Sequence, residues 1–186
     1  ILSRGHEIGH HGYMHEPPST LTKEQEIAIM DRSTGILEDV LGARPLGYRA
    51  PSWDPSVRTL ELVAAKGFLY DSSMMDDDIP YVLHTDSGDL VELPVHWSQD
   101  DAAYFWFHRG AGAMNTPSDV LEAWKWEFDG AYKYRAAFML TCHPQVSGHL
   151  SKIMMLDRLI KHIKSHPGAR FMYCRDVAQV VLERKG

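Results

Sequence analysis

The chain has 186 residues, of which 44% are hydrophobic and 24% are charged, a balance typical of one folded domain rather than of a disordered chain. Its formal net charge of −6 argues against a nucleic-acid partner, because phosphate binding uses clustered Lys and Arg. No apolar run approaches the roughly 18 residues of a membrane-crossing helix, and two cysteines are too few for a disulfide scaffold. We therefore expect a cytoplasmic protein that has neither a nucleic-acid nor a membrane partner.

The first half of the chain predicts helices and short strands in alternation. Thr22 and Gln25 have the spacing of a capping box, which marks the start of a helix. The expected elements are a helix at 22–41, a strand at 46–50, a helix that begins at Asp54 and Pro55 and ends at Gly67, and strands at 68–71 and 90–95.

The second half continues this pattern after an irregular stretch rich in aromatics and glycine that reaches to about residue 116. The expected elements are a helix at 116–134, an apolar strand at 136–143, a helix at 150–165, a strand at 170–174 and a closing helix through 177–181. The core side of the helix at 150–165 is predicted to carry Ile153, Leu156, Leu159, Ile160 and Ile163.

This alternation predicts an α/β fold, either a barrel or an open sheet, because short continuous apolar strands are typical of parallel sheets covered by helices. In both architectures reactive side chains collect at the carboxyl ends of the strands. Arg49, Asp71 and His143 all occupy such positions.

The segment HEIGHHGYMH at 6–15 allows two interpretations of its histidines. His6, Glu7 and His10 match the H-E-x-x-H signature of zinc proteases, which requires both histidines on one helix. Three glycines in and beside the segment oppose that helix, since each costs about 1 kcal/mol relative to Ala. We expect instead a short strand that opens into a loop at His10.

The second interpretation pairs His11 with His15 on that loop, where two imidazoles can converge on one cation. Catalytic zinc sites typically use three protein ligands and a water, so this pair is one ligand short. Taken alone, the H-x-x-x-H spacing is found more often in solvated loop histidines than in a metal site.

Four short boxes follow one another along the chain, namely HHGYMH at 10–15, RAPSW at 49–53, YDSS at 70–73 and LTCHP at 140–144. In their residues and their order they resemble the boxes of the polysaccharide deacetylase family, which includes chitooligosaccharide deacetylases. The resemblance implies a distorted (β/α) barrel that hydrolyses a carbon–nitrogen bond.

The resemblance also assigns the residues. His11 and His15 would bind the metal, Zn²⁺ or another divalent ion. The hydroxyl residue that typical members carry after the first of these histidines is replaced here by Gly12. This form is more similar to a branch with allantoinase-like enzymes and peptidoglycan deacetylase homologues, and that branch leaves open a weakly held metal or none.

In the remaining boxes, Arg49 would orient a catalytic aspartate, and Trp53 together with Pro51 would line the wall that contacts the substrate. His143 would protonate the leaving group, a task suited to an imidazole at neutral pH. Asp101 follows a predicted strand and is expected to contact the substrate.

The family's opening box, a strand that ends in paired aspartates, has no match in this sequence. We therefore expect one catalytic domain over 1–186 that lacks its N-terminal strands, with the base and the third metal ligand upstream of residue 1. The open barrel edge favours a homo-oligomer.

Three functions remain open at this point. The leading hypothesis is a hydrolase that removes N-acetyl groups from an amino-sugar polymer. The alternatives are a ring-opening hydrolase of a small cyclic ureide or imide, and a non-catalytic carbohydrate-binding or assembly domain.

Overall fold

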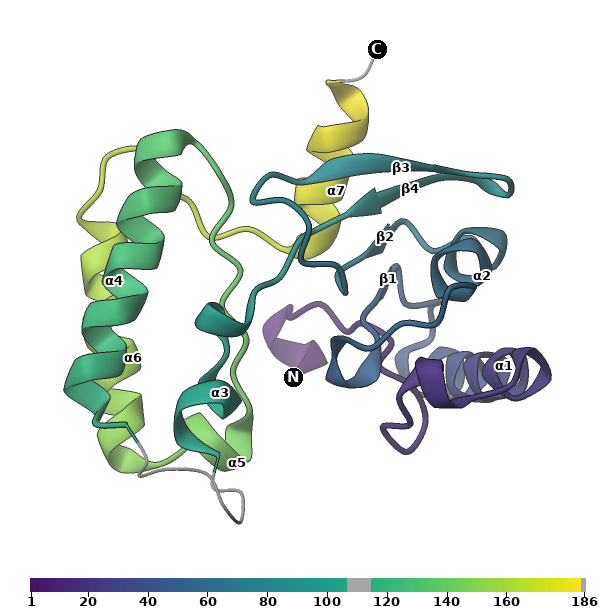
Figure 1. The fold of residues 1–186 in the computed structure, drawn as a ribbon, viewed down its shortest axis with the longest axis horizontal. Coiled ribbons are helices and arrows are strands. Elements are labelled where there is room, and N and C mark those ends of the chain that lie inside the picture. The colour runs from purple at the N-terminus through teal and green to yellow at the C-terminus, as the bar shows by residue number, and fades with distance from the viewer. Residues whose placement is uncertain (107–114, 185–186) are drawn as a thin grey trace. The chain divides into compact units, whose positions relative to one another are not determined.

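A computed structural model describes residues 1–106 and 115–184, and Figure 1 shows its elements. The chain divides into two compact units. The first unit consists of Ile1–Pro94 together with Met172–Gly186, and the second consists of Val95–Phe171. The expectation of one catalytic domain over 1–186 stays a prediction.

A four-stranded sheet forms the centre of the first unit. Its strands are β1 (Gly47–Tyr48), β2 (Tyr70–Asp71), β3 (Tyr81–Thr85) and β4 (Gly88–Glu92). The order is β1-β2-β4-β3, in which β1, β2 and β4 are parallel and β3 pairs with β4 as an antiparallel hairpin. The sheet does not close on itself, so the predicted α/β fold with an incomplete barrel is confirmed.

Helices cover the sheet of the first unit. They are α1 (Lys23–Leu41), α2 (Thr59–Ala65) and α7 (Cys174–Glu183). Leu90 of β4 packs in a cluster with α1 and α2, whereas its neighbour Val91 must point to the opposite face and is also buried. Because α7 packs against β2, β3 and β4, this sheet is covered on both faces, as its apolar strands predict.

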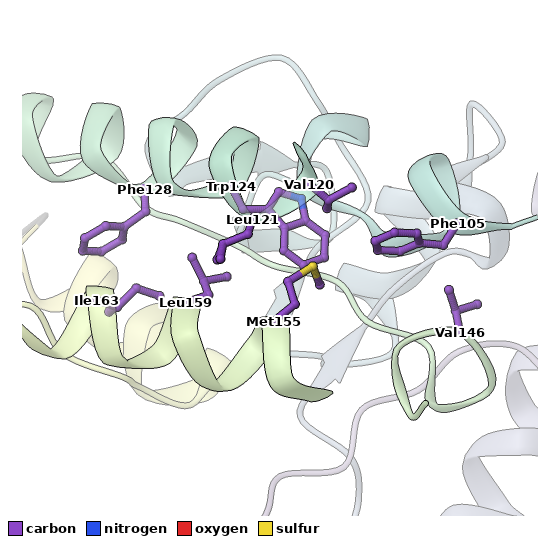
Figure 2. Packing of buried hydrophobic residues seen from close by; sticks show 9 residues of the cluster. All are labelled: Phe105, Val120, Leu121, Trp124, Phe128, Val146, Met155, Leu159 and Ile163. Atoms are coloured by element: carbon purple, nitrogen blue, oxygen red, sulfur yellow. The ribbon is translucent and has the colours of Figure 1, made fainter. Parts of the chain in front are cut away.

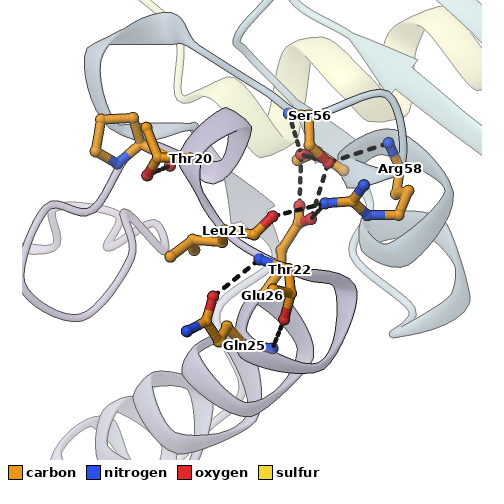
Figure 3. Close-up of polar contacts among 9 residues, drawn as sticks. Thr20, Leu21, Thr22, Gln25, Glu26, Ser56 and Arg58 are labelled. Carbon is orange, nitrogen blue, oxygen red and sulfur yellow. Dashed lines mark hydrogen bonds and ion pairs between the residues drawn. The ribbon is translucent and has the colours of Figure 1, made fainter.

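The capping box predicted for α1 is present. The side chain of Thr22 accepts from the backbone N–H of Gln25, and the side chain of Gln25 accepts from the backbone N–H of Thr22. One turn later, the buried carboxylate of Glu26 accepts a hydrogen bond of 2.5 Å from Thr59 and one of 2.8 Å from Ser56 (Figure 3). These bonds attach the start of α1 to the start of α2.

The predicted start of the second helix is wrong. This helix begins at Thr59 rather than at Asp54. The carboxylate of Asp54 accepts a hydrogen bond of 2.5 Å from Ser19 and does not cap a helix. Asp54 therefore bonds to a residue far away in the sequence instead of capping the helix that its local sequence predicts.

Helices alone make up the regular structure described in the second unit. They are α3 (Asp101–Phe105), α4 (Pro117–Tyr134), α5 (Pro144–Ser147) and α6 (Leu150–Lys164). Short 3-10 helices complete both units, at η1 (Leu2–Arg4), η2 (Pro18–Thr20), η3 (Pro51–Trp53) and η4 (Trp97–Gln99). The irregular stretch expected before residue 116 contains η4 and α3, and its part at 107–114 lies outside the described residues.

The core of the second unit lies between α4 and α6 (Figure 2). Trp124 and Phe128 of α4 pack there with Met155, Leu159 and Ile163 of α6. These three residues repeat every four positions and so form one stripe of the helix. Of the predicted core side of α6, Ile153 and Ile160 are exposed instead, because α6 is covered along that one stripe.

Three predicted strands are absent from the described residues. The stretch at 136–143 forms only a single bridge, Asp100 with Thr141, and 170–174 forms none. The expected strand at 7–9 is reduced to a bridge between His10 and Tyr48. An apolar run predicts burial, but a strand also needs a neighbour to pair with.

No helix within residues 1–106 and 115–184 is both long enough and apolar enough to span a membrane.

Candidate functional site

The two loop histidines of the first unit lie next to each other. The ring centres of His11 and His15 are 5.0 Å apart, with an angle of 76° between the rings. Two imidazoles bound at about 2.0–2.1 Å to one tetrahedral ion have ring centres about 5 Å apart. The pair therefore fits a shared divalent cation, and both side chains are exposed to solvent.

The position of His11 depends on strand β1. The chain at His10 bonds to β1 through the N–H of His10 and the oxygen of Gly47, and through the N–H of Arg49 and the oxygen of His10. Nδ1 of His11 then lies 2.8 Å from the carbonyl oxygen of Arg49. A backbone carbonyl that accepts from Nδ1 fixes the tautomer in which Nε2 is the metal-binding nitrogen.

Within the described residues, neither His11 nor His15 belongs to a cluster of three metal-binding side chains. A metal held by this pair therefore needs a further ligand, as the sequence predicts.

Gly12 is required where it stands. Its φ of +71° is a left-handed conformation, and a Cβ added there would lie 2.9 Å from Cγ of Pro51. A hydroxyl residue at this position would be strained and would push Pro51 aside. The departure from the typical family pattern thus has a local steric reason.

Left-handed backbone also occurs at residues that are not glycine. His15 has a φ of 65°, Ser52 of 58° and Trp53 of 50°. Such conformations cost of order 1–3 kcal/mol each and cluster at functional sites. These three lie in the two boxes that the sequence assigns to metal and substrate binding, whereas Arg135, with a φ of 60°, ends α4. Pro51 of the second box is buried and Trp53 is half-buried.

Arg49 is fixed to the neighbouring strand end. Its Nε donates to the carbonyl oxygen of Ser72 at 2.9 Å, and its Nη2 donates to Oγ of Ser72 at 2.7 Å. The backbone N–H of Ala50 donates to Oγ of Ser73. The YDSS box therefore holds the RAPSW box in place, and the predicted contact of Arg49 with a catalytic aspartate stays a prediction.

A buried pair of carboxyl groups lies at the same strand ends, and sequence reasoning missed it. Asp71 and Glu92 are paired in register across β2 and β4, and both are inaccessible to solvent. Burial raises the pKa of both groups, and the neighbouring charge of Asp71 raises the pKa of Glu92 further, to about 9. The sequence did contain a signal for this pair, because Asp71 and Glu92 each follow a short apolar run and parallel strands bring their carboxyl ends together at one edge of a sheet.

His10 is a core residue, which rules out the protease interpretation. Nε2 of His10 lies 2.5 Å from Oγ of Ser33, and burial lowers the pKa of His10 to about 4. Residues 6–10 form no helix. Glu7 accepts hydrogen bonds from the hydroxyl of Tyr70 and the backbone N–H of Arg175, so it ties chain segments together.

In the second unit, His143 is held by Asp101. Nδ1 of His143 lies 2.6 Å from Oδ1 of Asp101, and the other carboxylate oxygen accepts from the backbone N–H of His143 and from Oγ of Ser147. The side chain of Asp101 is fully buried. This arrangement fixes the imidazole through Nδ1, so Nε2 is the nitrogen that can meet a substrate.

These contacts of Asp101 indicate that it positions His143, a link that the sequence did not reveal. The predicted contact of Asp101 with substrate stays a prediction. Asp100, Asp101 and His143 also have donor atoms within 4.8 Å of one another. A metal there would have to replace the bond between Asp101 and His143, so the geometry favours an acid–imidazole pair.

Comparisons with known proteins agree with these features. The sequence model of the polysaccharide deacetylase family matches residues 1–70. The peptidoglycan deacetylase of Helicobacter pylori is 32% identical over 99% of this chain, which spans 73% of that protein.

Two solved structures are similar as well. A Mycobacterium smegmatis protein assigned to the polysaccharide deacetylases is 37% identical, with a TM-score of 0.95 over 100% of this chain and 66% of that one. Puue allantoinase is 29% identical, with a TM-score of 0.84 over 96% of this chain and 59% of that one. The chain thus spans less than two thirds of either solved relative.

The first unit has an open α/β sheet with a loop imidazole pair, and the second has a carboxylate-held imidazole, and both kinds of group are common in hydrolytic enzymes. The chain belongs to the polysaccharide deacetylase family, whose enzymes hydrolyse carbon–nitrogen bonds. The resemblance found in the sequence is therefore confirmed.

Proposed function

We propose that the protein removes N-acetyl groups from an amino-sugar polymer. The observation that carries this proposal is the hydrogen bond between His11 Nδ1 and the Arg49 carbonyl, which joins the metal box to the substrate box. The similarity to a peptidoglycan deacetylase supports the substrate class.

His11 and His15 are proposed to hold a divalent cation, zinc in the first instance, together with a further ligand. When bound, such an ion would polarise the amide carbonyl and would lower the pKa of its water to about 7. The chain's own contribution is to orient both imidazoles, through the carbonyl of Arg49 and the left-handed turn at His15.

His143 is proposed to give a proton from Nε2 to the amide nitrogen as the carbon–nitrogen bond breaks. The water oxygen bonds to the acetyl carbon and its proton passes to the catalytic base that the family's opening box is expected to supply, so that the carbon–nitrogen bond breaks to give acetate and a neutral amine. Asp101 holds the imidazole at Nδ1 during this transfer. A positioned general acid typically contributes about 10²- to 10⁴-fold in rate.

Pro51 and Trp53 are proposed to form a wall for the sugar. The ring of Trp53 supplies an apolar face that suits the carbon–hydrogen side of a pyranose. The left-handed backbone at Ser52 and Trp53 supports this role, because strained conformations of this kind cluster at active and ligand-binding sites.

A second candidate function is the opening of a cyclic ureide or imide. The similarity to Puue allantoinase at 29% identity favours it. Water would then attack a ring amide at the same metal site, and His143 would protonate the ring nitrogen as the carbon–nitrogen bond breaks. The homo-oligomer and the cytoplasmic location stay predictions for either function.

The test compares substrates with zinc-supplemented protein. Acetate release from N-acetylated chito-oligomers or peptidoglycan fragments is expected, without turnover of allantoin or hydantoin. Turnover of the rings alone would replace the first function by the second, and no turnover of either would favour a non-catalytic binding domain.

The matched variants are His143→Gln and His149→Gln, since His149 is an exposed histidine at the N-cap of α6 in the same unit. The first is expected to lose about 10²- to 10⁴-fold in kcat and the second to keep full activity. Equal activity of both variants would remove His143 from the mechanism.

A further inference from the structure

A second group of possible metal ligands lies in the second unit, apart from every residue used above. Asp129 of α4 and His162 and His166, at the end of α6, have donor atoms within 4.8 Å of one another. We propose that these three side chains bind a divalent transition-metal ion of the zinc class, which links α4 to α6.

The donor distances are near those of a bound ion. Nε2 of His166 lies 3.6 Å from Oδ1 of Asp129, and Nε2 of His162 lies 2.6 Å from the same oxygen. Ligand atoms about 2.0–2.2 Å from a tetrahedral ion are roughly 3.3–3.5 Å apart. The His166 distance already fits, and the His162 contact has to lengthen by under about 1 Å as the ion replaces the hydrogen bond.

The tautomer of His166 is set for metal binding. Its Nδ1 lies 2.9 Å from the carbonyl oxygen of His162, so Nδ1 carries the proton and Nε2 carries the lone pair. This lone pair lies on the side of Asp129. Metal-binding histidines commonly have such a backbone partner on the other ring nitrogen.

The surroundings hold the two rings in place. The centres of the His162 and His166 rings are 4.7 Å apart, and both rings pack edge-on against Phe128. Tyr132 contacts His166 at 4.9 Å between ring centres. Phe128 belongs to the buried core of this unit, as Figure 2 shows, so the rings rest on a rigid base.

Access and charge also favour a cation. The side chains of His162 and His166 are each 24% exposed and that of Asp129 is 43% exposed, so an ion and its waters can reach the donors. His162 lies in the last turn of α6, where the carbonyl end of the helix dipole attracts positive charge. Two nitrogens and one carboxylate form a donor set that suits Zn²⁺, and also Ni²⁺ or Cu²⁺.

Zinc titration of the metal-stripped protein, followed by calorimetry, tests the proposal. The double variant His162→Gln/His166→Gln is expected to bind one zinc equivalent fewer than the unmutated protein and to lose its share of the zinc-induced rise in Tm. His149→Gln, a change at the opposite end of α6, is expected to keep both. The double variant His11→Gln/His15→Gln reports separately on the proposed catalytic metal.

Asp129→Asn covers the case in which the double histidine variant does not fold. It keeps the size of the side chain but removes the carboxylate, and it is expected to weaken this zinc site by at least about 10- to 100-fold. An unchanged zinc stoichiometry and affinity in Asp129→Asn or in the folded double variant would overturn the proposal, and the three side chains would then be a simple ion-pair link between helices.

Discussion

The buried carboxyl pair predicts a specific pH dependence of stability. Asp71 Oδ2 and Glu92 Oε2 have no hydrogen-bond donor among the described residues, although the two groups interact with each other. One proton shared by the pair supplies that donor. Replacing Glu92 by Gln provides a permanent donor of similar shape, so the folded Glu92→Gln variant never has to ionise at this position.

The sign and size of the effect follow from the proton count. The pKa of Glu92 is about 9 in the folded state and 4.5 in the unfolded chain, so unfolding at neutral pH releases one proton. The free energy of unfolding therefore falls as pH rises between these values, by about 1.4 kcal/mol per pH unit. Between about pH 6.5 and 8.5, the ionisation of Glu92 is therefore expected to lower the free energy of unfolding by on the order of 2 kcal/mol.

Urea unfolding followed by circular dichroism over this range measures the effect. Glu92→Gln is expected to flatten the pH slope of the unfolding free energy by about 1.4 kcal/mol per unit. Glu122→Gln, an exposed position on α4, serves as the control and is expected to keep the slope of the unmutated protein. Identical slopes in both variants would show that Glu92 is ionised in the folded protein, and the shared-proton account would fail.

Three further substitutions have defined outcomes. Gly47→Ala would place a methyl carbon 1.9 Å from Cζ of the buried Tyr70, so a loss of about 1–3 kcal/mol or more is expected in urea unfolding, and an unchanged midpoint would contradict the packing described. Asp101→Asn is expected to lower kcat by about 10²- to 10⁴-fold and to shift its pH profile while KM stays similar, whereas a change in KM alone would indicate a substrate contact instead. Glu26→Ala removes a buried acceptor of three hydrogen bonds, and a lower Tm that corresponds to about 1.5–3 kcal/mol is expected, with no change of Tm as the contrary result.

Local signals in the sequence predicted the helices better than the strands. The capping box at Thr22 and the Thr116–Pro117 start gave α1 and α4 their first residues, because caps act within one turn. Strand β3 was missed, and 136–143 was wrongly assigned. A strand depends on a partner whose place in the sequence no local pattern specifies.

The same distinction applies to the site. The boxes make His11, His15, Arg49 and His143 candidates because each box is a short run of residues. The link from Asp101 to His143 spans 42 residues and became visible only in three dimensions. Partners that fix a reactive group can come from anywhere in the chain, so residue spacing does not reveal them.

Gly12 shows how a departure from a family pattern can follow from the fold itself. At the left-handed turn of Gly12, an added Cβ would lie 2.9 Å from Cγ of Pro51, so a hydroxyl residue cannot be placed there unless Pro51 shifts. Support for the imidazole pair then has to come from the backbone, and the carbonyl of Arg49 provides it at Nδ1 of His11. A backbone carbonyl is present whatever side chain position 49 carries. Metal affinity should therefore depend on the path of the chain at 49–51 more than on the guanidinium of Arg49.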